Sequence, residues 1–438
     1  MSNDPYSTKH DEPPLERLTQ SQLDGLVALH ERYMEGRIGG RRALLKRVDI
    51  SGLNLSDKNL RQADFSGCNM THMNLAFTNF QEASLYACDL SFSNLIHTNF
   101  VRADLRGAKI ESANLAGADL ERADLRGGAM TSDGTYAQPQ PVNFRGANMT
   151  GSKLVGSMAN NADFSDANLS MSKIHGADLR GARLMGADLS GANFENVNLM
   201  GANMSSAILT GSNVEAIMNS GVDLSDAITD SNIGPSLEEL QKPIMHLIDD
   251  HQLWVKTSGK EGQYLDLSGY DLRECKTLKK QKLTALKAVK AKFFGMNLFQ
   301  IELQSANLEG ADFRRCDLVQ ADFRGANLAG AKFSHSDLRE ANFLPLLFAT
   351  GSLQRFAPCN LKGAELRYAD LQGSKMKNAD LSNADLSYAN FTNCDLRDAD
   401  FTGAKIEGIV LLGADITGAK FDNEKSGSAF SLKSLSDN

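Results

Sequence analysis

This chain of 438 residues has six cysteines, eight histidines and 54 acidic residues, which are the residue types that could perform metal, nucleophilic or acid–base chemistry. The six cysteines form no Cys-x-x-Cys pair, so the spacing typical of a zinc site is missing. The eight histidines are scattered, and no short motif joins a nucleophile to a base or places a glycine-rich phosphate loop after a strand. We therefore expect that the protein is not an enzyme and has no catalytic residue, no cofactor and no metal site.

The acidic residues and cysteines follow one rule of spacing. An apolar residue, here called the centre, recurs every five positions, preceded by a small residue and Asp or Asn, as in Ala187-Asp188-Leu189-Ser190-Gly191. Asp and Asn are short enough to bond the local backbone at a turn. Every cysteine except Cys275 clearly fills the small position. These residues are therefore interpreted as repeat chemistry, and the cysteines as reduced.

The distribution of lysines distinguishes the two halves of the chain. Residues 45–233 carry 20 acidic and 14 basic residues, whereas residues 265–421 carry 19 acidic and 21 basic residues. Most of the difference comes from one segment with seven lysines and no acid: Lys276, Lys279, Lys280, Lys282, Lys287, Lys290 and Lys292. Three of them are five apart and would form a belt around one coil, although the segment also suits an amphipathic helix. A solvated belt is the simplest interpretation; a contact with nucleic acid, anionic lipid or the first half of the chain is the alternative.

A period of five cannot keep one face of a helix or a strand inward, because an α-helix repeats every 3.6 residues and a strand every 2. The chain must therefore turn within each unit and wind as a coil. Phenylalanines indicate the pitch, since Phe80 and Phe100 are twenty apart, as are Phe144 and Phe164. Four units per turn would stack each pair. The pattern predicts a four-sided β-solenoid with layers about 4.8 Å apart.

The repeated Ala-(Asp/Asn)-Leu-x-x units resemble the pentapeptide-repeat family, and the resemblance covers most of the chain. It implies an all-β solenoid, specifically a right-handed quadrilateral β-helix, in which the centre and the small residue two places before it point inward. The resemblance is specific for fold and weak for function.

Landmarks repeat along the chain at an offset of 221 to 222 residues. His30 corresponds to His251 and Tyr33 to Trp254, on two segments with helical spacing that start at capping boxes, Thr19 with Gln22 and Ser236 with Glu239. Interruptions at 127–141 and 344–358 also correspond. We interpret the chain as a tandem duplication in which each helix caps the exposed first coil of a solenoid, with those four residues as structural cap residues.

This gives five segments. We expect a disordered N-terminal segment (1–17), a capping helix with the first solenoid (18–233), a linker with the second capping helix (234–264), the second solenoid (265–421) and a C-terminal tail (422–438). The N-terminus lacks the basic start and apolar run of a signal peptide, and no 18-residue apolar stretch occurs, so we expect no transmembrane segment and a cytoplasmic location.

The function expected from these features is a non-catalytic scaffold for an unknown protein partner, with an oligomeric state that the sequence leaves open. The family resemblance implies an alternative, because some members imitate duplex DNA and bind DNA gyrase. This chain departs from them in its two units and in Arg102, Arg106, Arg122 and Arg126, which place positive charge on the imitating face. A third hypothesis is a nucleic-acid or anionic-membrane binder that uses the lysine belt, with nucleic acid the unlikely partner.

Overall fold

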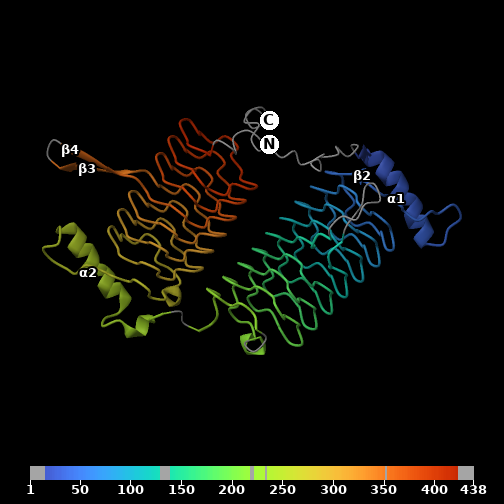
Figure 1. Ribbon diagram of the computed structural model, residues 1–438, viewed down its shortest axis with the longest axis horizontal. Helices are drawn as coiled ribbons and strands as arrows, with labels where there is room; N and C mark the ends of the chain where they lie inside the picture. The colour runs from blue at the N-terminus through green and yellow to red at the C-terminus, as the bar shows by residue number, and fades with distance from the viewer. Residues whose placement is uncertain (1–14, 129–138, 218–220, 232–233, 351–352, 423–438) are drawn as a thin grey trace, which may run out of the picture. The chain divides into compact units, whose positions relative to one another are not determined.

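The computed structural model describes residues 15–128, 139–217, 221–231, 234–350 and 353–422. Residues 1–14 of the segment expected to be disordered, residues 423–438 of the tail and most of the loop at 127–141 lie outside these residues. Residues 16 and 17, which were expected to be disordered, instead form a short strand. The chain divides into two compact units, Met1–Ser231 and Asn232–Asn438. Each unit has its own cluster of buried apolar side chains. In Figure 1 the first unit runs from blue to green and the second from yellow to red.

Both units are stacks of four-sided coils. Parallel bridges join residues twenty apart, so that Asp64 bridges Ser84 and Ser84 bridges Asp104. The backbone N–H of Leu85 donates to the carbonyl of Asp104 at 2.8 Å, and the N–H of Asp104 donates back to the carbonyl of Ala83 at 2.9 Å. Since each coil hydrogen-bonds to the next in this way, the solenoid with four units per turn is confirmed.

A turn after every centre keeps the sides short. The N–H of Cys88 donates to the carbonyl of Leu85 at 3.1 Å, and Ala87 between them has a φ of 54°. A positive φ at the third residue is the mark of a type II turn, for which glycine and asparagine are best suited. One bridged residue per side is all that remains between two turns. Regular strands among the described residues are therefore few: β1 (Glu16–Arg17) with β2 (Val48–Asp49) in parallel, and β3 (Leu346–Thr350) with β4 (Leu353–Ala357) antiparallel.

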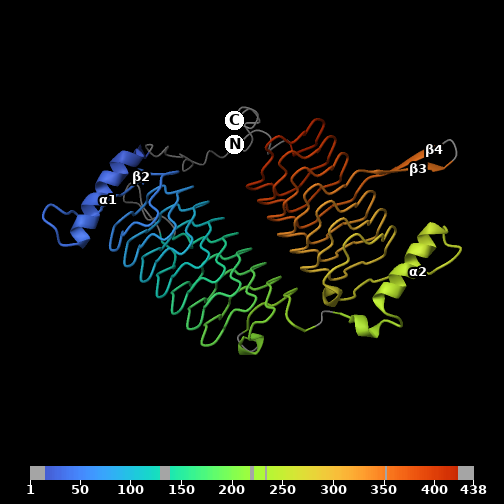
Figure 2. The same cartoon turned by 180° about the vertical axis from the view of Figure 1, so that it is seen from behind.

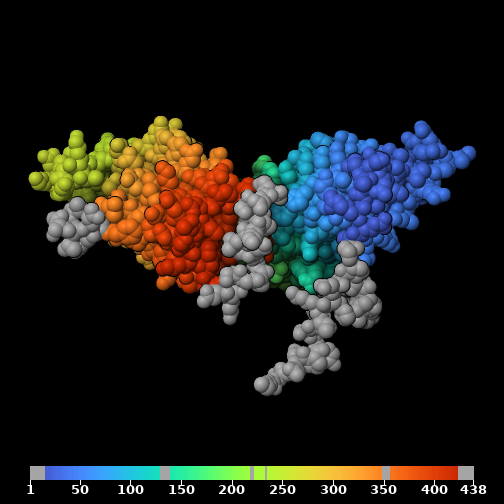
Figure 3. Space-filling model, turned by 90° about the horizontal axis from the view of Figure 1, so that it is seen from above, coloured from blue at the N-terminus to red at the C-terminus, as the bar shows by residue number. Residues whose placement is uncertain are grey.

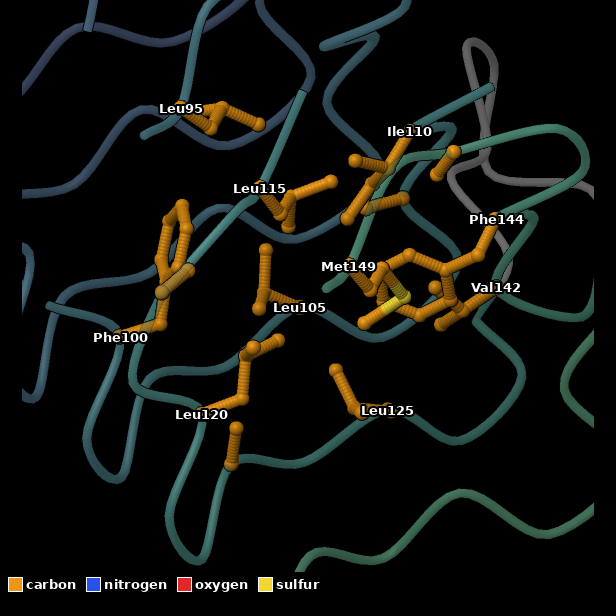
Figure 4. Close-up of a cluster of buried hydrophobic side chains, with 14 of the residues drawn as sticks. Leu95, Phe100, Leu105, Ile110, Leu115, Leu120, Leu125, Val142, Phe144 and Met149 are labelled. Carbon is orange, nitrogen blue, oxygen red and sulfur yellow. The ribbon is translucent and has the colours of Figure 1, made fainter. Parts of the chain in front are cut away.

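Centres and small residues fill the narrow core, as expected. Figure 4 shows leucines of successive sides converging on one another, with Phe100, Phe144 and Met149 among them. Phenylalanines twenty apart in sequence stack between coils, with ring centroids 5.7 Å apart for Phe80 and Phe100 and 4.9 Å for Phe144 and Phe164. The stacking expected from their spacing is therefore confirmed.

One helix precedes the coils of each unit. Helix α1 (Gln20–Met34) starts at the Thr19–Gln22 capping box. The corresponding box of Ser236 and Glu239 caps the short 3₁₀ helix η2 (Leu237–Glu239), and helix α2 (Ile244–Lys256) begins only after Pro243. Proline has no N–H to donate and fixes its own φ, which explains why the second helix is delayed. Each helix lies beside the first coils of its own unit and protrudes at its edge (Figures 1, 2 and 3).

Besides the loop at 127–141, irregular segments interrupt the repeat elsewhere in the described residues. The 3₁₀ helices η1 (Val214–Ala216) and η3 (Arg273–Cys275) replace regular turns, and η3 accounts for the irregular register around Cys275. Residues 344–358 contain the β3–β4 hairpin, which projects from the second unit in Figure 1. Residues 276–292 form turns and bridged sides of the coil, so the helical alternative for the lysine segment is wrong.

Candidate interaction surfaces

A buried histidine joins helix α1 to the first coil of its unit. The Nδ1 atom of His30 accepts the backbone N–H of Ala43 at 3.0 Å, and its Nε2 lies 3.1 Å from the carbonyl oxygen of Arg61. Because the N–H of Ala43 can only donate, Nδ1 carries no proton. Nε2 must therefore donate to the carbonyl, which fixes the neutral Nε2–H tautomer.

Helix α2 repeats this contact. The Nδ1 atom of His251 accepts the N–H of Leu265 at 3.1 Å, and its Nε2 lies 3.0 Å from the carbonyl oxygen of Thr284. Trp254 stacks on the imidazole with ring centroids 5.8 Å apart, and Tyr33 stacks on His30 at 6.1 Å. The structure thus brings each pair of expected cap residues together at equivalent places.

Burial sets the protonation of both histidines. Each imidazole is fully buried. Desolvation disfavours the charged form and lowers the pKa of His30 and of His251 below the ordinary value, while the hydrogen bond to a backbone carbonyl raises it in part. Neither ring is open to a substrate, so these residues connect helix and coil.

The seven lysines wind around the first two coils of the second unit. Lys282, Lys287 and Lys292 occupy the bridged positions of three successive sides, and the other four lie at or near corners. Lys287 pairs with Asp266 at 2.8 Å and Lys282 with Glu302 at 3.4 Å. Since the positive charges point in different directions, one flat membrane or one duplex can contact only a part of them.

A shallow groove of about 590 Å³ follows one side of the second unit. Two opposite pairs meet in it, because Arg324 binds Asp322 through two N–H groups and Lys282 faces Glu302. The remaining lining residues are Lys280, Gln300, Gln304 and Gln320. Glutamine amides link neighbouring coils here. Three cationic side chains line the groove with two carboxylates, so it is a polar surface with a net charge of +1 and no assembled nucleophile and base.

Arginines that interrupt an acidic face neutralise aspartates of their own repeat. Arg106 clamps Asp104 through Nε and Nη2 at 2.9 and 2.8 Å, and Arg126 clamps Asp124 at 2.9 and 2.7 Å. The spacing Asp-x-Arg places both side chains at one corner. Arg102 and Arg122 lie 3.8 Å from Glu82 and Glu121 respectively. This side of the first unit is therefore not a continuous acidic surface.

The cysteines are core residues. Cys68, Cys88, Cys316, Cys359 and Cys394 are free thiols and buried, and Cys275 is half-buried. The thiol of Cys88 donates to the carbonyl of Phe65, the centre of the preceding coil, at 2.9 Å. Burial raises the pKa of Cys68 to about 11. A thiol in this state is a poor nucleophile and a poor metal ligand.

The described residues contain neither a metal-binding cluster nor a membrane-spanning helix. No group of three or more His, Cys, Asp and Glu side chains there is arranged to hold a metal ion. Neither helix in this part of the chain is long and apolar enough to cross a membrane.

One side of the first unit is free of charge over two coils, and sequence reasoning did not single it out. We call it the asparagine face. Its bridged positions carry Asn54, Asn74, Asn94, Asn114, Asn148 and Asn168. Residues 71–77 and 91–97 of this face contain no Asp, Glu, Lys or Arg. The amide of Asn94 donates to Asn74 at 3.1 Å.

Aromatic rings border the asparagine face at both corners. His72 stacks with Phe92 at 5.1 Å between ring centroids, and Phe77 faces His97 at 5.2 Å. Phe77 is 58% exposed and Phe92 is 50% exposed. Both histidines are exposed. The sequence could have indicated the two phenylalanines, because each lies two places after a centre, where the repeat usually has a polar residue or glycine.

Comparison with known proteins gives a family match. The family model described as pentapeptide repeats matches eight copies that together span more than half of the chain: residues 43–81, 54–91, 88–127, 143–181, 177–215, 306–343, 359–398 and 394–423. No curated protein sequence matches the chain.

Several solved structures are similar. HetL, a pentapeptide repeat protein involved in heterocyst differentiation regulation from the cyanobacterium Nostoc sp. strain PCC 7120, is 19% identical, with 90% of this chain and 95% of HetL covered and a TM-score of 0.21. A trypsin-treated form of QnrB1, a plasmid-mediated fluoroquinolone resistance protein, is 20% identical, with 44% and 92% covered and a TM-score of 0.23. Rfr23 from the cyanobacterium Cyanothece 51142 is 32% identical, with 28% and 88% covered and a TM-score of 0.15. Superpositions with such low scores support no further conclusion.

Proposed function

Because this chain belongs to the pentapeptide-repeat family, we propose that it is a non-catalytic scaffold that binds another protein through the flat sides of its solenoids. We also propose the finer architecture: two tandem right-handed solenoids, each capped by its own helix, in a cytoplasmic protein. The boundaries proposed for the solenoids with their caps are 18–233 and 234–421.

The proposal is supported by the structural roles of the aspartates, arginines and cysteines, which are the residue types that could otherwise perform chemistry. Aspartates accept backbone N–H groups two residues ahead, as Asp178 does from Arg180, and arginines clamp those same carboxylates. Cysteines fill the core. These side chains thus stabilise the coil. What the solenoids offer a partner is an extended surface, which suits protein binding better than small-molecule chemistry.

Affinity capture with the full tagged chain in its native cells tests the scaffold proposal. We expect one or a few proteins to be retained in proportion to the bait and to be displaced by an excess of untagged chain. Capture that untagged chain does not displace, in repeated experiments, would overturn the proposal.

Two alternatives are less well supported. A DNA-imitating gyrase binder needs an acidic surface, whereas Arg106 and Arg126 neutralise Asp104 and Asp124. Inhibition of gyrase supercoiling by stoichiometric chain would favour this alternative over the scaffold. A binder of nucleic acid or anionic lipid through Lys276–Lys292 would show affinity for DNA or for phosphatidylserine vesicles that falls steeply with salt.

A further inference from the structure

We propose that the asparagine face of the second and third coils of the first unit, residues 71–77 and 91–97, pairs with the same face of a second copy of this chain. The inference goes beyond the scaffold function and needs no foreign partner, so its failure would leave that proposal standing.

The backbone is unfavourable for two of the four rings. His72, Phe77, Phe92 and His97 have φ values of 57°, 58°, 61° and 52°. Glycine, asparagine and histidine adopt this left-handed region more readily than a phenylalanine does. Other coils of the same two corners do place glycine there, at Gly52, Gly117 and Gly151. Phe77 and Phe92 nonetheless expose half or more of their surface. Each phenylalanine ring contacts a histidine ring of the neighbouring coil, which offsets part of the backbone cost. The other part of each ring lies in water, and a second surface would bury it.

The charge of the first unit is unevenly distributed. Residues 45–233 carry an excess of six acidic side chains, 20 against 14 basic, so two copies of this unit have the same sign of net charge. The asparagine face has no Asp, Glu, Lys or Arg over the second and third coils. Burying it therefore removes no carboxylate, ammonium or guanidinium group from water. Interface cores are likewise depleted of charge and enriched in aromatic residues.

The four rings are arranged diagonally over the face. The second coil begins this side with His72 and ends it with Phe77, whereas the third coil begins with Phe92 and ends with His97. The two histidines therefore lie on one diagonal of the patch and the two phenylalanines lie on the other. A two-fold axis between two facing copies must lie in the plane of the interface.

That alternation makes the patch self-complementary. If the axis runs along the solenoid, each corner faces the opposite corner of the same coil. If it runs across the solenoid, each coil faces its neighbour at the same corner. In both cases every histidine ring lies opposite a phenylalanine ring of the second copy, and no imidazole faces an imidazole. The asparagines between the corners bring amide donors and acceptors, which can pair with an identical row.

Sedimentation velocity of the full chain over about a 100-fold range of concentration tests the pairing, because a dimer responds to concentration by mass action. We expect the weight-average mass to rise from 47.5 kDa toward twice that value. The double variant Phe77→Asp/Phe92→Asp should stay at the monomer mass. Aspartate is tolerated at a positive φ, so the coil should keep its circular dichroism and melting temperature.

Two further variants keep the test decisive. Met200→Asp is the control. It replaces an apolar side chain that is 65% exposed at another corner by an aspartate, and this variant should dimerise like the unaltered chain. Phe77→Asn/Phe92→Asn removes the rings without adding charge and should also stay monomeric. A monomeric unaltered chain at every concentration, a dimer that persists in either double variant, or loss of the dimer in Met200→Asp would each overturn the proposal.

Discussion

At the corners of the coils, where φ is positive, the cost of a side chain depends on the backbone angle and on the residue that lies beneath it in the neighbouring coil. Gly117 and Gly151 occupy the same corner in neighbouring coils, with φ values of 67° and 65°. A Cβ on Gly117 would overlap the ring of His97 from the coil below, whereas a Cβ on Gly151 would meet nothing within 4 Å. The two positions therefore separate the cost of the backbone angle from the cost of a clash.

We expect Gly151→Ala to lower the free energy of unfolding by roughly 1–2 kcal/mol, the cost of a left-handed alanine. Gly117→Ala should cost about 1–3 kcal/mol more, because the His97 ring must also move. Urea denaturation followed by circular dichroism measures both. Equal losses for the two variants would show that His97 moves away freely.

The cysteines test the core assignment at the same scale. Burial raises the pKa of Cys88, Cys316 and Cys359, and each thiol is enclosed by neighbouring coils. We expect an aromatic disulfide reagent at pH 8 to modify only the half-buried Cys275 of the folded chain, and all six thiols after unfolding in guanidinium. Rapid modification of several thiols in the folded chain would contradict the assigned register.

Sequence spacing is sufficient to assign most inward residues, because one rule of five fixes the centre and the small position wherever the register is regular. It could not assign contacts between corner side chains. Phe77 and Phe92 are fifteen residues apart, and they border one face only because four sides complete a coil. Such neighbours become visible once the pitch is combined with the corner positions.

At the scale of elements, each helix depends on one histidine. The Nδ1 atom of His251 accepts a backbone N–H and would lose that bond if it were protonated. Its pKa is lowered by burial, so the unfolded chain binds a proton more readily than the folded one does. The stability that follows is fully present above the ordinary histidine pKa and is lost as the pH falls below about 6.5.

We therefore expect the second unit to unfold at lower urea concentration at pH 5.5 than at pH 7.5. Trp254 is the only tryptophan of the chain, and its fluorescence reports on this unit. His251→Gln should be less stable at pH 7.5 and should lose most of the pH dependence in this range. His175→Gln, at an exposed position, should behave like the unaltered chain. Aspartates with lowered pKa act only at lower pH, since their ordinary value is near 3.8. Unchanged pH dependence in His251→Gln would refute the assignment.

The elements differ in how far the sequence determines them. Both capping boxes form, since they need only residues three apart. The β3–β4 hairpin was expected only as an interruption. Phe348 and Leu353 continue the five-residue spacing, so the apolar pattern of 344–358 does not distinguish a hairpin from further sides of the coil. Pairing between Leu347 and Phe356 decides the outcome, and spacing alone does not contain it.

At the scale of the whole molecule, the two units are alike in contacts as well as in sequence. His30 joins Ala43 to Arg61, and His251 joins Leu265 to Thr284. The equivalent histidines are 221 residues apart, their N–H donors 222 and their carbonyl acceptors 223. One extra residue in the second unit between successive landmarks accounts for this increase. A duplicated unit that kept its own helix and first coil explains this correspondence. Chance similarity of two helices would not reproduce the coil partners.

Each unit has its own buried cluster, so we expect residues 1–233 and 234–438 to fold as separate chains. Both fragments should be soluble and rich in β-structure, and each should melt cooperatively. The competing idea is one continuous solenoid with an inserted helix, in which coils before residue 230 and after residue 265 share a ladder. All bridges of the described residues instead stay within one unit. Circular dichroism melts of the two fragments, alone and mixed, decide the matter, because a core that crossed the junction would make both fragments aggregate alone and recover only together.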